Sequence, residues 1–157
     1  CSNGTMVNPL EGEAICEIYQ ARLVLESYAA RDSVGRMGEA ELNALERCIQ
    51  NCKQAHKKGD MQRVVEENTR FHELVVSYCQ NALIRDMIAR QRDLSLLARR
   101  REFETYHKED RYLAEHSEIL QAIRSEDADL VERRMRRHIG HDLDFYRMHL
   151  NAEHGKE

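Results

Sequence analysis

Three histidines have the positions that would allow them to bind one metal ion together. His72, His116 and His138 each share the helical spacing of the apolar residues around them, so each is predicted on the buried face of a different helix. A buried polar side chain without a partner costs about 1–3 kcal/mol. Any one of the three could be a core histidine bonded to neighbouring protein groups. Together they favour a shared metal ion, because neutral imidazole is a common ligand of zinc, nickel, copper and iron.

Asn68 is the candidate for a fourth ligand, since it lies one helical turn before His72 on the same predicted face. The expected cofactor is a divalent metal, with zinc or nickel favoured by the histidine-rich donor set. His141 and Asp142 follow His138 on the last predicted helix and could orient the ligands. For His141, a surface position is the competing expectation. The other four histidines lie near helix ends or in the predicted tail and are expected at the surface: His56, His107, His149 and His154.

These residues are positioned by a series of amphipathic segments with the period of an α-helix. Helices are predicted over six ranges: about 11–31, 39–57, 61–79, 82–101, 105–125 and 127–150. Asp60, Asn81 and Thr105 are predicted N-caps, because their side chains can accept hydrogen bonds from first-turn N–H groups. No segment alternates apolar and polar residues as a half-buried strand does. The predicted fold is therefore all-α, an antiparallel bundle of about six helices with a central cavity for a metal and a ligand.

Length and composition fit a single helical domain. The chain has 157 residues, which is long enough for a core without disulfides. Its formal charge of −4 does not favour nucleic-acid binding, and no apolar run is long enough for a membrane span. The five cysteines are odd in number and include no CxxC pair, so buried free thiols in a reducing cytoplasm are expected. Cys48 and Cys52 lie one helical turn apart, and a redox or metal role for that pair is the alternative.

Four short stretches have an order and spacing similar to those of a known family: RLVLE at 22–26, NTRFH at 68–72, EHSEILQAI at 115–123 and RRH at 136–138. They resemble the R-x-x-L-E, D-x-x-F-H, E-H-x-x-I-L-x-A-I and R-R-H segments of the C-terminal effector-binding (FCD) domain of FadR-subfamily GntR-type transcription regulators. The resemblance extends from about Glu13 to Leu150, which is nearly the whole chain.

The resemblance implies a sensor rather than an enzyme. In such regulators the sensor is joined to an N-terminal winged helix-turn-helix that enters the DNA major groove as a homodimer. On this interpretation residues 1–10 are a linker from the missing DNA-binding domain, residues 11–150 are the ligand-sensing domain, and residues 151–157 are a C-terminal tail. No contact with a membrane is implied, and contact with DNA is made only through the missing domain.

The effector implied by the resemblance is a small organic acid bound beside the metal. Arg22 is the candidate cation for fixing the acid, and a salt bridge to Glu26 is the alternative role for this arginine. Gln91 could donate a further hydrogen bond to the effector, and solvation or a structural pairing is its alternative. The family's first metal ligand is Asp, whereas this chain has Asn68. A neutral amide predicts weaker metal binding and stronger attraction for an anionic effector, or else a partly empty site.

Two other functions are compatible with the same residues. A helical-bundle metalloenzyme of hydrolase type would hold a catalytic metal on the three histidines. Its general base would be Asp142, the only acidic candidate on a ligand-bearing core face. A structural interaction module would instead keep the histidines in its core without metal. Turnover of carboxylic esters or amides separates the enzyme from the sensor, and metal content separates the module from both.

Overall fold

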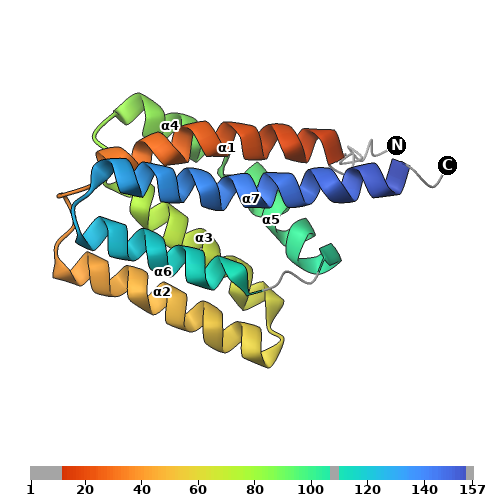
Figure 1. The fold of residues 1–157 in the computed structure, drawn as a ribbon, viewed down its shortest axis with the longest axis horizontal. Helices are drawn as coiled ribbons and strands as arrows, with labels where there is room; N and C mark the ends of the chain where they lie inside the picture. Colours follow the sequence, from red (N-terminus) through yellow and green to blue (C-terminus); the bar gives the residue numbers. More distant parts are fainter. Residues whose placement is uncertain (1–11, 107–109, 155–157) are drawn as a thin grey trace, which may run out of the picture.

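The computed structural model describes residues 12–106 and 110–154, and within these ranges all the regular structure is α-helical. Seven helices follow one another, as Figure 1 shows: α1 (Gly12–Asp32), α2 (Glu39–Lys58), α3 (Met61–Ser77), α4 (Ala82–Arg90), α5 (Arg92–Tyr106), α6 (Arg111–Arg124) and α7 (Ala128–His154). The predicted all-α bundle is confirmed. The predicted linker, residues 1–10, lies outside the described residues.

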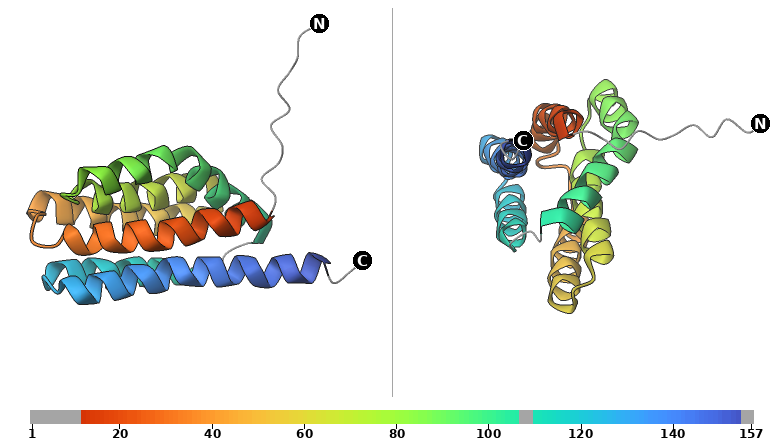
Figure 2. Two further views of the ribbon diagram at one scale, coloured as in Figure 1. Left: turned by 90° about the horizontal axis from the view of Figure 1, so that it is seen from above. Right: turned by 90° about the vertical axis from the view of Figure 1, so that its right-hand side faces the viewer.

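Helices α1 and α7 lie side by side and run in opposite directions (Figure 1, Figure 2). Helix α2 packs against α3, and α6 lies between α7 and α2. On another side of the bundle, α4 packs against α1, and α5 packs against both α1 and α3. No helix in the described ranges has the length and apolar character needed to cross a membrane. The helices instead bury one face each against their neighbours.

Polar side chains begin two helices where the sequence predicts them. Oδ1 of Asp60 accepts a hydrogen bond from the backbone N–H of Arg63 at 3.0 Å, at the start of α3. Oδ1 of Asn81 accepts one from the N–H of Ile84 at 3.2 Å, at the start of α4. Both side chains satisfy first-turn donors that have no partner within the helix, so these two N-cap predictions are confirmed.

The range 82–101, predicted as one helix, contains two. Helix α4 ends at Arg90 and α5 begins at Arg92, and the backbone turns between them at Gln91, with φ of −95° and ψ of 1°. The turn allows α4 to lie against α1 while α5 crosses to α3. The prediction was wrong because tertiary packing outweighs the local preference for a continuous helix.

The predicted N-cap at Thr105 is also wrong. Thr105 lies inside α5, which continues to Tyr106, and the next helix begins only at Arg111. A hydroxyl group can cap a helix only where the backbone enters it, and the N-cap of α6 is Asp110, five residues later than Thr105. The last helix extends to His154, beyond the predicted end near Leu150.

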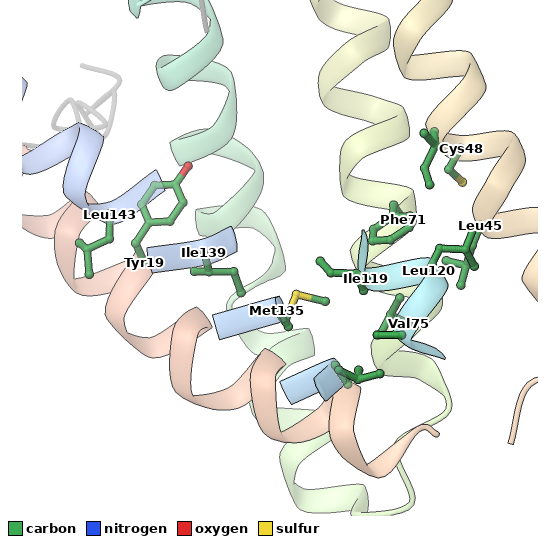
Figure 3. Close-up of a cluster of buried hydrophobic side chains, with 14 of the residues drawn as sticks. Tyr19, Leu45, Cys48, Phe71, Val75, Ile119, Leu120, Met135, Ile139 and Leu143 are labelled. Carbon is green, nitrogen blue, oxygen red and sulfur yellow. The ribbon is translucent and has the colours of Figure 1, made fainter. Parts of the chain in front are cut away.

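The main hydrophobic core lies between α1 and α7 on one side and α2, α3 and α6 on the other (Figure 3). Tyr19 and Ile139 pack at the α1–α7 contact, and Phe71 and Leu120 pack where α3 meets α6. Burial of large side chains of this kind contributes about 1.5–3 kcal/mol each. The same packing that stabilises the bundle therefore fixes the relative positions of α3, α6 and α7, which carry the three histidines.

Gly59 offers a test of how α2 ends. It adopts a left-handed conformation with φ of 71°, and a Cβ atom there would meet nothing within 4 Å. Gly59→Ala should therefore lower the free energy of unfolding by about 1 kcal/mol through backbone strain alone. Gly140→Ala is the control, because Gly140 lies within α7 and its added Cβ would be 3.7 Å from a methyl group of Leu23. It should raise stability by about 0.5–1 kcal/mol. Urea unfolding measures the free energy of unfolding of both variants. If Gly59→Ala is as stable as the unaltered protein, the strain argument is contradicted.

Candidate metal centre

The three predicted histidines meet at one point inside the bundle. Nε2 of His138 lies 3.1 Å from Nε2 of His72 and 3.2 Å from Nε2 of His116, and the remaining pair of Nε2 atoms is 3.4 Å apart. All three side chains are buried, with at most 2% of the residue surface exposed. They are the residues in the described ranges whose side-chain atoms are grouped closely enough to share a metal ion.

Two of the three imidazoles each have a buried carboxylate at Nδ1, the ring nitrogen that faces away from the meeting point. Nδ1 of His72 is 2.7 Å from Oε2 of Glu26, and Nδ1 of His138 is 2.7 Å from Oε2 of Glu115. An ionised carboxylate only accepts hydrogen bonds, so each Nδ1 carries the proton and donates it. Nε2 of both rings is then left with a lone pair directed at the point where the imidazoles meet.

Nε2 of His116 could donate a proton to only one of these two lone pairs, which would leave the other unsatisfied. A proton can bridge only one pair of nitrogens, whereas a metal ion binds all three. Nitrogen ligands at about 2.0–2.1 Å from one metal ion are separated from each other by about 2.8 Å at a right angle to about 3.4 Å at the tetrahedral angle. The three Nε2 distances lie in this range. The residues therefore fit a divalent metal held by His72, His116 and His138, which would supply positive charge and open coordination positions.

The protonation state of His72 suits a metal ligand. Burial lowers the pKa of this imidazole to about 3, with the charge of Arg99 acting in the same direction and Glu26 opposing it. Burial alone would raise the pKa of Glu26, because it disfavours the charged carboxylate. The attraction of this carboxylate to Arg22, His72 and Arg99 is stronger than that effect, so the pKa of Glu26 is well below its ordinary value. At neutral pH the pair is thus a neutral imidazole donating to a carboxylate, which is the state that metal binding requires.

Aromatic packing positions His116, the third imidazole. Its ring stacks on Phe71 with centroids 4.1 Å apart and an interplanar angle of 16°. The Tyr112 ring, one turn earlier on α6, lies at 78° to the imidazole plane with ring centroids 6.1 Å apart. Because Phe71 directly precedes His72 on α3, one aromatic side chain contacts both ligand-bearing positions. Offset stacking of this kind fixes the plane of an imidazole ring.

Asn68 is buried on α3, one turn before His72, as predicted. Its Oδ1 atom has no hydrogen-bond partner among the described residues. A buried carbonyl oxygen in that condition is costly unless something binds it. Asn68 as the fourth ligand stays a prediction, and the unsatisfied oxygen favours it.

Arg22 is buried and forms the ion pair with Glu26 that was the alternative to effector binding. Its Nε donates to Oε1 of Glu26 at 2.7 Å, with 2% and 6% of the two side chains exposed. The pair is therefore not the weak exposed bridge that i, i+4 spacing usually gives. The two roles are compatible, because both terminal nitrogens of Arg22 are buried without a hydrogen-bond partner among the described residues.

Arg99 is a second buried cation, which the sequence analysis did not identify. Its Nη1 donates to Oγ1 of Thr69 at 3.1 Å, and its Nη2 is 3.9 Å from Oε1 of Glu26. Its Nε has no hydrogen-bond partner in the described part of the chain. Glu26 therefore lies between two guanidinium groups and His72. Arg99 begins a run of three arginines, which in sequence is typical of a solvated surface.

A cavity of about 230 Å³ opens beside His72 and Glu26, between α1, α3, α4 and α5. The sequence predicted a cavity at the centre of the bundle, and this one lies to one side of the histidines. A small recess next to it is lined by Arg22, Gln91 and Ser95. The structure thus brings the two predicted effector-binding residues together, and Ser95 lines both spaces.

His141 and Asp142, the two residues that could orient the ligands, both lie close to the histidine cluster. His141 is partly exposed, yet its Nδ1 lies 2.6 Å from Oε1 of Glu115, so it contacts the carboxylate that holds His138. Asp142 is buried and interacts electrostatically with Arg22 and Arg99. The expectation that Asp142 is the only acidic candidate on a ligand-bearing core face was wrong, because Glu115 on α6 is also buried.

The remaining candidates lie away from the histidine cluster. His56 is half-buried rather than at the surface, with Nδ1 3.4 Å from the hydroxyl of Tyr112. The side chains of His107, His149 and His154 lie outside the described residues. Four cysteines are buried and free, as expected: Cys16, Cys48, Cys52 and Cys79. Burial raises the pKa of the Cys48 thiol to about 11 and that of Cys52 to about 12, so neither is a reactive thiolate at neutral pH.

Glu26 and Glu115 are the functional residues whose roles sequence reasoning missed. Each had a signal: Glu26 ends the RLVLE stretch, and Glu115 directly precedes His116 in EHSEILQAI. An acidic residue at a helical position is usually solvated, so periodicity alone does not distinguish these two from surface glutamates. Only the packing of α1 against α3 and of α6 against α7 shows that each reaches a histidine on the neighbouring helix.

The fold and the site together define a helical ligand-binding domain with a buried donor set. The chain belongs to the FCD domain family, the effector-binding domains of GntR-type regulators, and the match covers residues 17–141. The resemblance noted in the sequence is thereby confirmed. The HTH-type transcriptional regulator YdhC of Bacillus subtilis (strain 168) is 26% identical over 156 residues, which is 99% of this chain and 69% of that protein.

Solved structures share the fold. E. coli McbR/YncC superposes with a TM-score of 0.76 at 17% identity, covering 90% of this chain and 68% of that one. Streptococcus agalactiae GntR superposes with a TM-score of 0.66 at 20% identity, covering 85% of this chain and 60% of that one. At these identities the likeness establishes the architecture, and the site has to be argued from this chain's own residues.

Replacing one carboxylate oxygen behind the ligands should weaken metal binding. In the unaltered protein, Nδ1 of His138 and Nδ1 of His141 each donate to one oxygen of Glu115. Glu115→Gln leaves a single acceptor oxygen for the two donors. Zinc affinity should fall about 10–100-fold, because outer groups set the tautomer and basicity of a ligating histidine. Glu118→Gln is the matched control, as Glu118 lies on the same helix, is partly exposed and pairs with Arg134. Competition titration with a chromophoric chelator measures both, and equal affinities would contradict the role of Glu115.

Proposed function

We propose that this domain is the sensor of a GntR-type regulator and binds a divalent metal together with a small carboxylate effector. The metal is held by His72, His116 and His138, with Asn68 as the fourth ligand and zinc or nickel as the ion. The effector modulates DNA binding by an N-terminal winged helix-turn-helix, and the regulator acts as a homodimer. Membership of the FCD family supports the sensor role. The proposals of a metal and of an effector are based on the geometry of this chain's own residues.

The observation that carries the proposal is the convergence of three buried Nε2 atoms, two of them with Nδ1 bonded to a carboxylate. A purely structural core would gain little by turning three ring nitrogens toward one point, because a proton can join only two of them. A divalent ion converts this arrangement from a cost into a source of stability, because it binds the folded chain and not the unfolded one.

The effector site is supported by the groups around the cavity. His72 and Arg99 line its inner wall, and Arg22 and Gln91 line the adjoining recess. Buried guanidinium nitrogens without partners are suited to a carboxylate, which they can bind with two parallel hydrogen bonds. A carboxylate oxygen could also occupy an open coordination position of the metal.

Regulation follows if the effector binds two arrangements of the dimer with different affinity. A ligand changes the populations of two states only by its differential affinity for them. The cavity is bounded by four helices, and α4 and α5 meet at the turn around Gln91 beside it. An effector there contacts elements that can shift relative to α1 and α3.

His116→Ala tests the metal directly. The variant removes one of three ligands, so bound zinc should fall to the background level, and removal of zinc by a chelator should no longer lower its melting temperature. For the unaltered protein, zinc at about 100 times Kd should add about 2.7 kcal/mol of stability. His56→Ala is the control, because His56 lies outside the cluster. Elemental analysis and thermal unfolding provide the readouts. Full zinc content in the His116 variant would exclude His116 as a ligand.

Asn68→Asp tests the fourth ligand. A carboxylate in place of the amide oxygen adds a negative charge next to the ion, so zinc affinity should rise by about tenfold or more. Asn43→Asp, at an exposed position on α2, controls for the change in net charge. A competition titration in which the two variants bind zinc alike would argue against Asn68 as a ligand.

A further inference from the structure

The cavity beside His72 has a polar inner end and an apolar outer wall. Thr69, His72 and Arg99 lie at the inner end, and Val76, Ile88 and Ala89 form much of the remaining surface. Its volume of about 230 Å³ is larger than the roughly 150 Å³ of a dry cavity that holds benzene. By that comparison it holds about nine non-hydrogen atoms. Acetate would leave most of the space unfilled.

Helix α4 has little contact with the core, although one of its faces is apolar. None of its nine residues is buried. Ile84 and Ile88 are half-buried and rest against a small cluster of Ala29, Val76 and Cys79. Ile88 and Ala89 face the cavity. An apolar group in the cavity would therefore bury surface of α4 that this helix does not bury against the protein itself.

The buried charges at the cavity provide one cation for a carboxylate. Glu26 accepts a hydrogen bond from Arg22 at 2.7 Å, whereas its Oε1 lies 3.9 Å from Nη2 of Arg99. Nε of Arg99 has no hydrogen-bond partner among the described residues, and Arg99 lines the cavity. A single carboxylate can pair with this guanidinium group, whereas a second would be buried without a partner.

The cations at the outer end of the cavity are already engaged by the protein. Arg92 donates to Oε1 of Glu73, and Arg85 donates to the backbone oxygen of Cys79. All three of Arg92, Glu73 and Arg85 line the cavity. A second carboxylate at this end would have to displace one of these interactions. The outer end is therefore a poor site for a diacid such as adipate.

We propose that the effector is a monocarboxylic acid with an apolar body of about five or six carbon atoms, bound with its carboxylate at Arg99 and its body against Val76, Ile88 and Ala89. This inference rests on the proposed carboxylate sensor and specifies its ligand class. It also assigns to Arg99 a binding role that the sequence did not suggest. The apolar body would then hold α4 against the rest of the domain.

Isothermal titration calorimetry on the zinc-saturated protein tests the ligand class, with acetate, hexanoate and adipate as probes. Each added methylene buried in the cavity should tighten binding about fourfold. Hexanoate should therefore bind at least tenfold more tightly than acetate. It should also bind at least tenfold more tightly than adipate, which has the same chain length and a second carboxylate. The heat capacity change for hexanoate should be negative, as burial of apolar surface requires.

Ala89→Leu tests the position of the apolar body. Leucine fills part of the cavity and is a good helix former, so hexanoate affinity should fall at least tenfold while acetate binding is retained. Ala114→Leu is the matched control, because Ala114 is exposed on α6 and does not line the cavity. Arg99→Lys should weaken both acids without changing zinc content, since lysine keeps the charge and loses the paired donors.

The outcomes separate the inference from the proposed function. Hexanoate binding that is no tighter than that of adipate or acetate would overturn the monocarboxylate inference and leave the carboxylate sensor standing. Binding of none of the three acids to the zinc-saturated protein would overturn both. If Ala89→Leu or Arg99→Lys does not fold, as judged by circular dichroism, the comparison of the three acids on the unaltered protein still decides the ligand class.

Discussion

The site depends on one constraint: two buried carboxylates fix which nitrogen of an imidazole carries the proton. Glu26 and Glu115 accept from Nδ1 of His72 and His138, so the Nε2 lone pairs of these rings are directed at a common point. His116 completes the triangle through its stacking on Phe71. Without the carboxylates the rings could adopt the other tautomer, and a proton rather than a cation could satisfy the cluster. These two carboxylates thus prepare the cluster for the proposed metal without belonging to its ligand set.

Glu26 also links the metal centre to the cavity. The same carboxylate accepts from His72 and from Nε of Arg22 and lies 3.9 Å from Nη2 of Arg99. The two guanidinium groups are held in place at the edge of the cavity with nitrogens still available to a ligand. One residue therefore sets the tautomer of a proposed metal ligand and positions two cations beside the cavity. Changes in effector binding and changes in metal binding are expected to be coupled through it.

The presence of Asn68 where the family has Asp is easier to understand in this setting. A neutral first ligand alone would leave a divalent ion with its full charge. Here Glu26, Glu115 and Asp142 supply negative charge just outside the proposed ligands, and arginines offset it: Arg22, Arg99 and Arg111. The charge available to an effector is therefore set by the whole buried network and not by the ligand set alone.

The sequence by itself determined the helical class, most helix boundaries and the three ligand-bearing positions, because a buried face repeats with the helical period and can be recognised locally. It also identified Asp60 and Asn81 as caps, since capping involves neighbours only. Tertiary structure decided the rest. The break at Gln91, the burial of Arg99, and the contacts of Glu26 and Glu115 with histidines on other helices depend on which faces meet. Sequence periodicity shows which side of a helix is buried, but partners and charge balance arise only when separate helices pack together.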